Sequence, residues 1–407
     1  MRRISCALLM AAVVGCSDEA RITQPLDRTQ SPEVLAKQAP TAEYTIVKLT
    51  SSLGGTVSRG SGINNRGWVV GFSNLPGDQI RHATLWRDGA IIDLGTLGGE
   101  KSSSNVQWPG VSDRGMIAGI SQTAIPDPLK EDWSCSAFLP VTGTTCLGFV
   151  WDDGVMKPLP TLGGNNGFAA GVNNRGQVVG WAETLVHDPT CNAPQVLQFR
   201  AVMWEPRKRG SKIRELPPFR GDSTSAATAI NDRGQTVGIS GDCDVAVGRF
   251  SARHAVLWER GRVKEIPNLG GTSWHTPMDI NEAGDVVGFS NPAGDAGGIF
   301  IARAFLWTGG RKSRDLGVLR GDATSQARGI NSRRQVVGVS TGTNGNRAFL
   351  WEDGVMKDLN TLVGPGFSDQ LVSAQHINEA GAITGTLLES STGKTLTFVA
   401  VPKAVTP

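Results

Sequence analysis

Short apolar segments separated by glycine-containing turns recur along most of the chain, and each group of four predicts one β-sheet. A first strand ends in Gly-Ile-Asn or a close variant, as at residues 62–64, and a hairpin glycine precedes a second strand such as residues 177–180. A third strand ends in Trp, as at residues 254–258, and a fourth contains Asp-Leu-Gly and runs into Leu-Gly-Gly, as at residues 93–99. The third strand is apolar at successive positions, which predicts that both of its faces are buried between neighbouring sheets.

The last residue of the first strand, an Asn in all but one unit, sets the period of the repeat. Intervals between successive units are 48, 61, 58, 50, 50 and 47 residues. A period near 50 residues with four strands per unit is typical of propeller blades. The sequence therefore predicts an all-β fold, a seven-bladed β-propeller of four-stranded blades over residues 44–402. These anchor positions are Asn64, Ser112, Asn173, Asn231, Asn281, Asn331 and Asn378.

The residues between the strands have the chemistry that tight hairpins require. Asp-Gly pairs at residues 88–89, 153–154 and 353–354 indicate two-residue turns between the third and fourth strands. Between the first and second strands, Gly67 and Gly176 lie where a left-handed backbone conformation is needed.

The two ends of the repeat region together complete one blade. Residues 44–49 precede Leu-Gly-Gly and match a fourth strand, whereas the last unit has only three strands, near residues 372–378, 382–387 and 396–401. The N-terminal segment is therefore predicted to supply the missing strand, so that the ring closes without an open edge.

The third strands share a His-Ala-Phe-type segment, present at residues 82–86, 254–258 and 348–351. These segments resemble the HAF family of bacterial extracellular repeat proteins, and the resemblance covers nearly all of residues 44–401. It implies an exported, propeller-like repeat protein rather than a particular activity. Three positions depart from the repeat, namely Arg334 in place of the hairpin glycine, Ser112 in place of the anchor Asn and Ala400 in place of the final Trp.

The N-terminus predicts export and lipid attachment. Two arginines precede a short apolar run, residues 7–14, which is too short to span a bilayer and leads into Gly-Cys. The segment Val-Val-Gly-Cys resembles the bacterial lipobox, which implies a lipoprotein signal peptide over residues 1–15 and lipidation of Cys16. Ser17 follows, where an Asp would indicate retention in the inner membrane, so the outer membrane or the cell surface is expected. An ordinary signal peptide or a buried helix is the alternative.

The remaining chain offers no second means of membrane or nucleic acid attachment. Residues 16–43 mix charges with prolines and show no periodicity, which predicts a flexible tether behind the lipidated cysteine. No later segment is apolar enough to cross a membrane. Basic and acidic residues balance, 40 against 37, which gives no electrostatic basis for binding nucleic acid.

The four cysteines that remain after residue 16 predict two disulfides, because the export signal directs the chain to an oxidising compartment. Cys135 and Cys146 lie within one long insertion of blade 2, whereas Cys191 and Cys243 lie in insertions of neighbouring blades. We expect the pairs Cys135–Cys146 and Cys191–Cys243, with free buried thiols as the alternative.

The repeated tryptophans and asparagines are expected to be structural. A regular place at the end of a buried strand favours packing over carbohydrate stacking. The anchor Asn is expected to cap its own turn through side-chain to backbone hydrogen bonds. The repeated tryptophans are Trp86, Trp151, Trp204, Trp258, Trp307 and Trp351.

Strand order predicts that the two faces of the ring differ. Tight hairpins occupy one face, here called the hairpin face. The longer loops between second and third strands occupy the other, here called the insertion face. Four residues before the anchor the chain has compact residues in six blades and Trp108 in blade 2, which favours a binding platform at the insertion face. Side chains that merely fill the axial channel are the alternative. Further candidates for ligand binding are Arg59, Phe168, Trp274, His275, Arg328 and Gln375.

These patterns favour a monomeric binding or scaffolding module with a protein or glycan partner over an enzyme. The alternative is a hydrolase or lyase acting on an extracellular polymer at the axial channel, which would require acids or histidines on the inner strands. There the sequence offers only Asp279, His275 and His376, and the Gly-x-Ser-x-Gly, His-Glu-x-x-His, Cys-x-x-Cys and calcium-loop motifs are absent. No catalytic residue, metal ligand or cofactor is therefore predicted.

Overall fold

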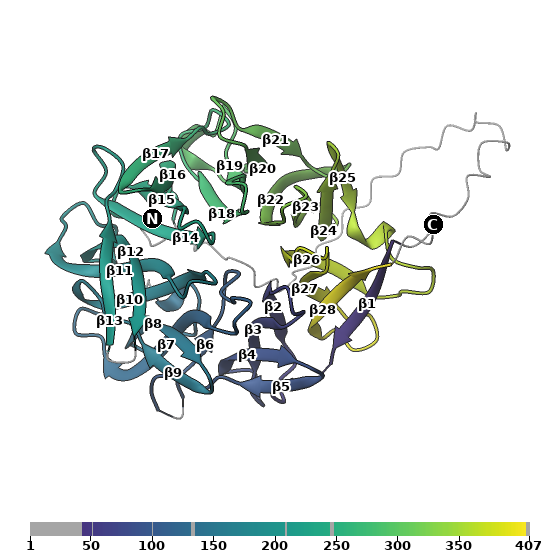
Figure 1. Ribbon diagram of the computed structural model, residues 1–407, viewed down its shortest axis with the longest axis horizontal. Helices are drawn as coiled ribbons and strands as arrows, with labels where there is room; N and C mark the ends of the chain where they lie inside the picture. Colours follow the sequence, from purple (N-terminus) through teal and green to yellow (C-terminus); the bar gives the residue numbers. More distant parts are fainter. Residues whose placement is uncertain are drawn as a thin grey trace, which may run out of the picture.

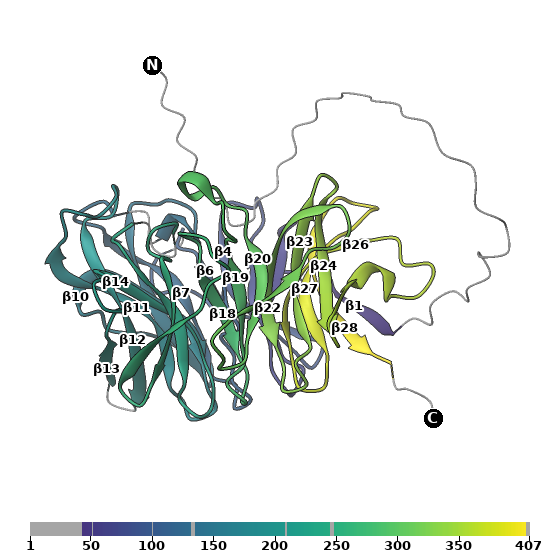
Figure 2. The same ribbon diagram turned by 90° about the horizontal axis from the view of Figure 1, so that it is seen from above.

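Seven four-stranded antiparallel sheets form a ring in the computed structural model, which describes residues 43–50, 52–99, 101–131, 135–207, 210–244 and 248–403 (Figure 1). The first strand of each sheet lies nearest the axis and the fourth lies at the rim, and the side view shows one layer of blades (Figure 2). The predicted seven-bladed propeller is confirmed. The predicted signal peptide, Cys16 and the tether up to residue 42 lie outside the described residues.

Blades 1 to 4 follow one another along the chain from the inner strand to the outer one. Blade 1 comprises β2 (Ser58–Ile63), β3 (Val69–Asn74), β4 (Arg81–Arg87) and β5 (Ala90–Asp93). Blade 2 comprises β6 (Ser104–Asn105), β7 (Ile117–Pro126), β8 (Thr144–Asp152) and β9 (Val155–Pro158). Blade 3 comprises β10 (Gly163–Val172), β11 (Val178–His187), β12 (Leu197–Arg207) and β13 (Gly210–Leu216). Blade 4 comprises β14 (Thr224–Ile230), β15 (Thr236–Gly241), β16 (His254–Glu259) and β17 (Arg262–Ile266).

Blades 5 and 6 repeat this order, and blade 7 takes its outer strand from the N-terminus. Blade 5 comprises β18 (Thr276–Ile280), β19 (Val286–Ser290), β20 (Arg303–Trp307) and β21 (Arg314–Gly317), with the short helix η2 (Ala296–Gly298) between β19 and β20. Blade 6 comprises β22 (Asp322–Ile330), β23 (Val336–Gly342), β24 (Gly345–Glu352) and β25 (Val355–Asp358), followed by η3 (Leu359–Thr361). Blade 7 comprises β26 (Gln370–Ile377), β27 (Ile383–Leu388), β28 (Thr395–Pro402) and β1 (Tyr44–Leu49).

The ring closes as the sequence predicts. Strand β1 pairs with β28 over its whole length, from Tyr44 opposite Pro402 to Leu49 opposite Thr397. Tyr44 is buried against Leu362 and other apolar residues of blade 7. Because β1 pairs with the outer edge of β28, the sheet of blade 7 has four strands, as the other six sheets do.

The repeated tryptophans lie in the core between blades. Each of the six is between 1% and 8% exposed, which confirms the packing interpretation. Trp151 of blade 2 packs with Val70 and Leu85 of blade 1, so its indole contacts two neighbouring sheets. The indole N–H of Trp204 donates to the carbonyl of Pro160 at 2.8 Å, which satisfies a polar group that burial would otherwise leave unpaired.

The predicted hairpins have the expected backbone. Asp88 and Gly89 have φ angles of +53° and +79°, as a turn between two twisted strands requires. Arg334, which replaces the hairpin glycine in blade 6, also takes a left-handed conformation with φ +60°. Its Nε lies 2.7 Å from the Asp285 carboxylate of blade 5, and this ion pair favours a backbone geometry that glycine adopts more readily.

Both predicted disulfides are present, Cys135–Cys146 and Cys191–Cys243. The first joins the blade 2 insertion to strand β8, which contains Cys146, and the second joins the insertions of blades 3 and 4. In the described part of the chain, no helix is long and apolar enough to cross a membrane.

Candidate functional site

A β-bulge recurs at one level of the inner strands and determines which side chains are re-aimed there. In blade 6 Arg328 falls between two regular pairs of the β22–β23 ladder, and in blade 7 Gln375 does so in β26–β27. A bulged residue has no partner in the ladder, so its side chain leaves the regular alternation of the strand. The bulged residues in chain order are Ser61, Ala170, Thr228, Met278, Arg328 and Gln375.

A glycine on the second strand accommodates the bulge. A Cβ added to Gly71 would lie 1.8 Å from the carbonyl oxygen of Arg59, and one added to Gly338 would lie 2.0 Å from that of Gln326. No side chain fits at such distances, so the Val-Val-Gly pattern of the second strand is a requirement of the bulge. From the sequence alone, this pattern predicts only a strand.

Two arginines and three glutamines, Arg59, Gln107, Gln326, Arg328 and Gln375, meet on the inner segments of blades 1, 2, 6 and 7. We call them the arginine–glutamine group. The Arg59 Nη2 donates to the side-chain oxygen of Gln107. Arg328 donates through Nη1 to Gln375 at 2.7 Å and through Nη2 to Gln326 at 3.2 Å. The Nε atoms of both arginines are buried without a hydrogen-bond partner.

Both guanidinium groups keep their charge without a counterion among the described residues. Burial, and then repulsion by Arg328 and Arg81, lowers the pKa of Arg59 to about 9. Burial lowers the pKa of Arg328 to about 10. Both groups therefore stay protonated at neutral pH, and their acceptors are neutral amides rather than carboxylates. Arg59 is 8% exposed, whereas Arg328, Gln107 and Gln326 keep partial exposure to solvent.

Trp108 and Phe168 lie inside an aromatic cluster rather than on an exposed platform. Each is 1% exposed. Trp108 meets Phe168 edge to face at 5.3 Å, and Phe168 stacks on Trp181 at 4.3 Å. Phe138 from the blade 2 insertion covers both Trp108 and Phe168. The expectation that Trp108 presents an exposed face is wrong in this structure, because the insertion packs onto it. The rings pack with Phe138 and Trp181 in a cluster between blades 2 and 3, whereas the alternative interpretation expected such side chains to fill the axial channel.

Trp274 and His275 are also buried, at 2% and 1% exposure. The Trp274 indole donates to the carbonyl of Gly298 at 3.1 Å. The His275 Nδ1 lies 2.8 Å from the Ser290 hydroxyl, and burial lowers the pKa of His275 to about 4, so its imidazole is neutral at physiological pH. These side chains connect parts of blade 5, and their role in ligand binding stays a prediction without an exposed surface to support it.

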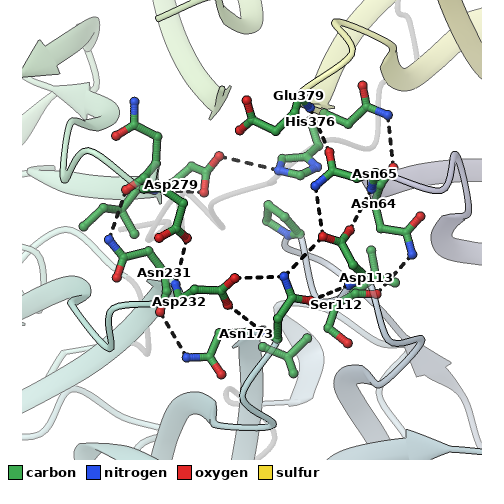
Figure 3. Close-up of a pocket in the computed structure, with 18 of the residues that line it drawn as sticks. Asn64, Asn65, Ser112, Asp113, Asn173, Asn231, Asp232, Asp279, His376 and Glu379 are labelled. Carbon is green, nitrogen blue, oxygen red and sulfur yellow. Dashed lines mark hydrogen bonds and ion pairs between the residues drawn. The ribbon is translucent and has the colours of Figure 1, made fainter. Parts of the chain in front are cut away.

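At the hairpin face the anchor asparagines link six of the seven blades to the next blade (Figure 3). The Asn64 side-chain oxygen accepts from the backbone N–H groups of Arg66 and Trp68, which confirms the predicted turn cap. Its Nδ2 donates to the carbonyl of Ser112 in blade 2 at 3.0 Å. The same inter-blade bond starts from the Nδ2 of Asn173, Asn231, Asn281, Asn331 and Asn378. We call these six bonds the asparagine ring.

A second circle of bonds lies one residue further along each hairpin. The backbone N–H of Asn65 donates to Asp113 of the next blade at 2.8 Å, and that of Asn174 donates to Asp232 at 2.7 Å. The N–H of Glu379 donates to the Asn65 side chain at 3.0 Å, across the point of ring closure. The acidic residues at this mouth therefore accept backbone hydrogen bonds between blades.

A pocket of about 140 Å³ opens at this mouth, lined by residues of all seven blades. Inside it the His376 Nε2 lies 3.6 Å from the Asp279 carboxylate (Figure 3). Asp279 accepts from the backbone N–H of Ile330 in blade 6 at 2.9 Å. His376 Nδ1 lies 3.0 Å from the Ile63 carbonyl in blade 1. Residues that are isolated in the sequence thus form an acid–imidazole pair between blades 5 and 7, and each of them also contacts the backbone of the next blade.

Three acids that the sequence did not single out are buried together near the insertion face. Asp127, Glu131 and Glu183 are at most 5% exposed. The Asn166 side chain donates to Asp127 at 2.8 Å and to Glu183 at 3.2 Å. Burial and the nearby Glu131 charge raise the pKa of Glu183 to about 8. No repeat pattern marks these residues, because they come from the insertion of blade 2 and from β11.

The described residues bring together one set of three potential metal ligands, Asp188 with Cys191 and Cys243. Both cysteines are joined in a disulfide, so their sulfur atoms do not act as thiolate ligands.

No family model matches the chain, and no curated protein matches it. Among solved structures it is similar to a chain of a mitotic checkpoint complex, with 12% identity, a TM-score of 0.48 and coverage of 97% of this chain and 100% of that one. It is similar to a polysaccharide lyase at 10% identity and TM-score 0.46, covering 86% and 91% of the two chains. It is also similar to a Trypanosoma rangeli sialidase at 11% identity and TM-score 0.36, covering 77% and 56%. Function is therefore inferred from the chain's own residues.

Proposed function

We propose that the chain is an exported, monomeric lipoprotein, anchored through Cys16 at the outer membrane or cell surface. Its propeller binds a protein or glycan ligand at the insertion-face end of the axis. The HAF-type segments of the third strands support export. The two disulfides indicate an oxidising compartment, which agrees with an extracytoplasmic location.

One observation carries the binding proposal. Residues 59, 107, 328 and 375 are distant in sequence and come from four blades. The Arg59–Gln107 and Arg328–Gln375 pairs nevertheless lie close enough for the two arginines to repel each other. Two buried Nε donors there have no acceptor. Leaving a buried donor unpaired costs about 1–3 kcal/mol, so a site with several such donors is expected to gain from a ligand that supplies acceptors.

The anchor is tested separately from the binding site. Cys16→Ala should leave the protein unprocessed or release it from membranes, because stable attachment needs the acyl chains. Fractionation in high salt measures this, with Cys191→Ala as a cysteine control that keeps the lipid. If the Cys16 variant is cleaved like the wild type and still stays wholly with the membrane, the lipid anchor is wrong and the binding proposal is unaffected.

The alternative function is a hydrolase or lyase acting on an extracellular polymer. The Asp279–His376 pair favours it, because a carboxylate beside an imidazole is a usable acid–base pair. Its contacts with the backbone of Ile330 and Ile63, however, give both side chains a structural role.

A screen on glycan and peptide arrays, combined with a turnover assay on the same polymers, distinguishes the two functions. We expect a retained ligand that is recovered unchanged, and loss of retention when Arg59 and Arg328 are both replaced by Gln. Polymer cleavage that His376→Ala abolishes, with the thermal midpoint unchanged, would establish the enzyme instead.

A further inference from the structure

We infer that the arginine–glutamine group, Arg59, Gln107, Gln326, Arg328 and Gln375, binds the anionic group of an acidic saccharide. The inference rests on the proposed binding function and names the chemical class of its ligand. The fold does not require a charged residue at the bulge of an inner strand, since the bulged residues of blades 3, 4 and 5 are Ala170, Thr228 and Met278.

The uncompensated positive charge at the site favours an anionic ligand. Burying a guanidinium without a counterion is costly, and a buried charge is normally paired. Arg59 and Arg328 are close enough for mutual repulsion to disfavour the charge on Arg59, and Arg81 adds to it. The described residues place no carboxylate against either guanidinium group. A ligand oxyanion would supply the acceptor that the Nε atoms lack, and guanidinium groups bind carboxylate or sulfate through paired hydrogen bonds.

The neutral residues around the arginines suit a polyhydroxylated ligand. Ser61, Arg328 and Gln375 are the bulged residues of three consecutive blades, 1, 6 and 7. The Ser61 hydroxyl is buried without a partner, and glutamine amides offer donors and acceptors together. Sugar hydroxyls also donate and accept. An extended peptide that added to a sheet would instead bind through main-chain hydrogen bonds at the free edge of an inner strand, which faces the axis, and would not need these charged side chains.

Isothermal titration of the full-length protein in detergent tests the inference with four probes. These are trigalacturonate, its uncharged methyl ester, a sulfated galactose oligosaccharide and pentaglutamate. We expect at least one acidic saccharide to bind roughly tenfold more tightly than the ester, and salt to weaken that binding. Arg59→Gln and Arg328→Gln should each weaken binding of the acidic saccharide roughly tenfold, since each removes a guanidinium group that can form paired, charge-assisted hydrogen bonds. Arg175→Gln, at the exposed hairpin face, should change nothing.

Arg328→Lys keeps the positive charge but loses the planar guanidinium group, so it should bind the acidic saccharide with intermediate affinity. Because the test uses several variants, it still applies if one of them fails to fold. Equal affinity for trigalacturonate and its ester would overturn the anion inference and leave the binding function standing. Preference for pentaglutamate would overturn the saccharide class. Acidic-saccharide binding that both Gln variants keep would place the ligand elsewhere. If none of the four probes binds, the inference fails, whereas the proposed function fails only if the arrays also yield no ligand.

Discussion

The side-chain amide of Asn378 donates to the backbone carbonyl of Asn64 at 3.0 Å, although 314 residues separate them in sequence. This bond closes the asparagine ring between blades 7 and 1. The pairing of β1 with β28 closes blade 7 itself at the rim. Two sets of hydrogen bonds therefore close the propeller: side-chain bonds near the axis, and the backbone bonds between β1 and β28 at the rim.

Asn378→Asp should isolate the inter-blade bond. An aspartate keeps the oxygen that accepts from the Ala382 N–H at 2.9 Å, but it loses the Nδ2 donor and brings a negative charge towards the Asn64 carbonyl. We expect a loss of about 1–3 kcal/mol in the free energy of unfolding. Denaturant titration measures it. A variant as stable as the wild type would show that the ring bond contributes nothing.

Ser112→Asn makes the opposite change. In blade 2 the Ser112 hydroxyl accepts from the Met116 N–H at 3.1 Å but is shorter than the asparagine that would reach blade 3. Asparagine at this position should cap the same turn and add a bond to the Asn173 carbonyl, raising the free energy of unfolding by about 0.5–1.5 kcal/mol. A destabilised Ser112→Asn protein would contradict the view that the ring is incomplete there.

Deletion of residues 44–49 should open the ring. It removes the buried Tyr44 and exposes the full edge of β28, so we expect several kcal/mol of destabilisation and concentration-dependent aggregation. Deletion of residues 17–41, which precede β1, is the matched control and should leave the melting temperature almost unchanged. Calorimetry and light scattering compare them, and equal melting temperatures for the two deletions would defeat closure by the N-terminal strand.

Stability should depend on pH through Glu183. Its pKa is raised to about 8 in the folded protein by burial and by Glu131, whereas in the unfolded chain it returns to 4.5. Between these values the folded state holds a proton that the unfolded state releases, so this contribution to the free energy of unfolding falls as pH rises from about 5 to 8. Glu183→Gln should flatten the dependence, and the exposed Glu265→Gln should not. An unchanged slope in the Glu183 variant would contradict the assignment.

Trp108→Ala should destabilise the protein by about 3–5 kcal/mol, as expected for loss of a large buried ring. Trp108→Phe should cost much less, because the buried Trp108 indole N–H has no partner to lose. Thermal denaturation of both variants measures the difference. If Trp108→Ala keeps the wild-type melting temperature and loses ligand binding, the ring is an exposed platform after all.

Local patterns were sufficient to predict the blades, the closing strand and both disulfides. The Asp88–Gly89 pair determines its own turn, because both residues take left-handed conformations. Residues 44–49 match the sequence pattern of a fourth strand, which the last unit lacks, and they pair with β28. The cap formed by the Asn64 oxygen was also predictable, since its acceptor atom and its donors lie in one hairpin.

Features that depend on how blades face one another were not predictable. The donation from Asn64 to Ser112, and the meeting of Asp279 with His376, require the relative placement of separate sheets. The burial of Trp108 depends on Phe138, which comes from an insertion with no repeat to guide it. The sequence position of Arg328 makes it a candidate, but the bulge that re-aims its side chain appears only in the paired strands.

A crystal structure of the protein with the tightest ligand from the arrays tests the central claim most directly. We predict ligand density at the insertion-face end of the axis, with acceptor atoms of the ligand within hydrogen-bonding distance of Arg59 and Arg328. Density in the pocket at the hairpin face, between Asp232 and Glu379, or on the rim of the blades would contradict it.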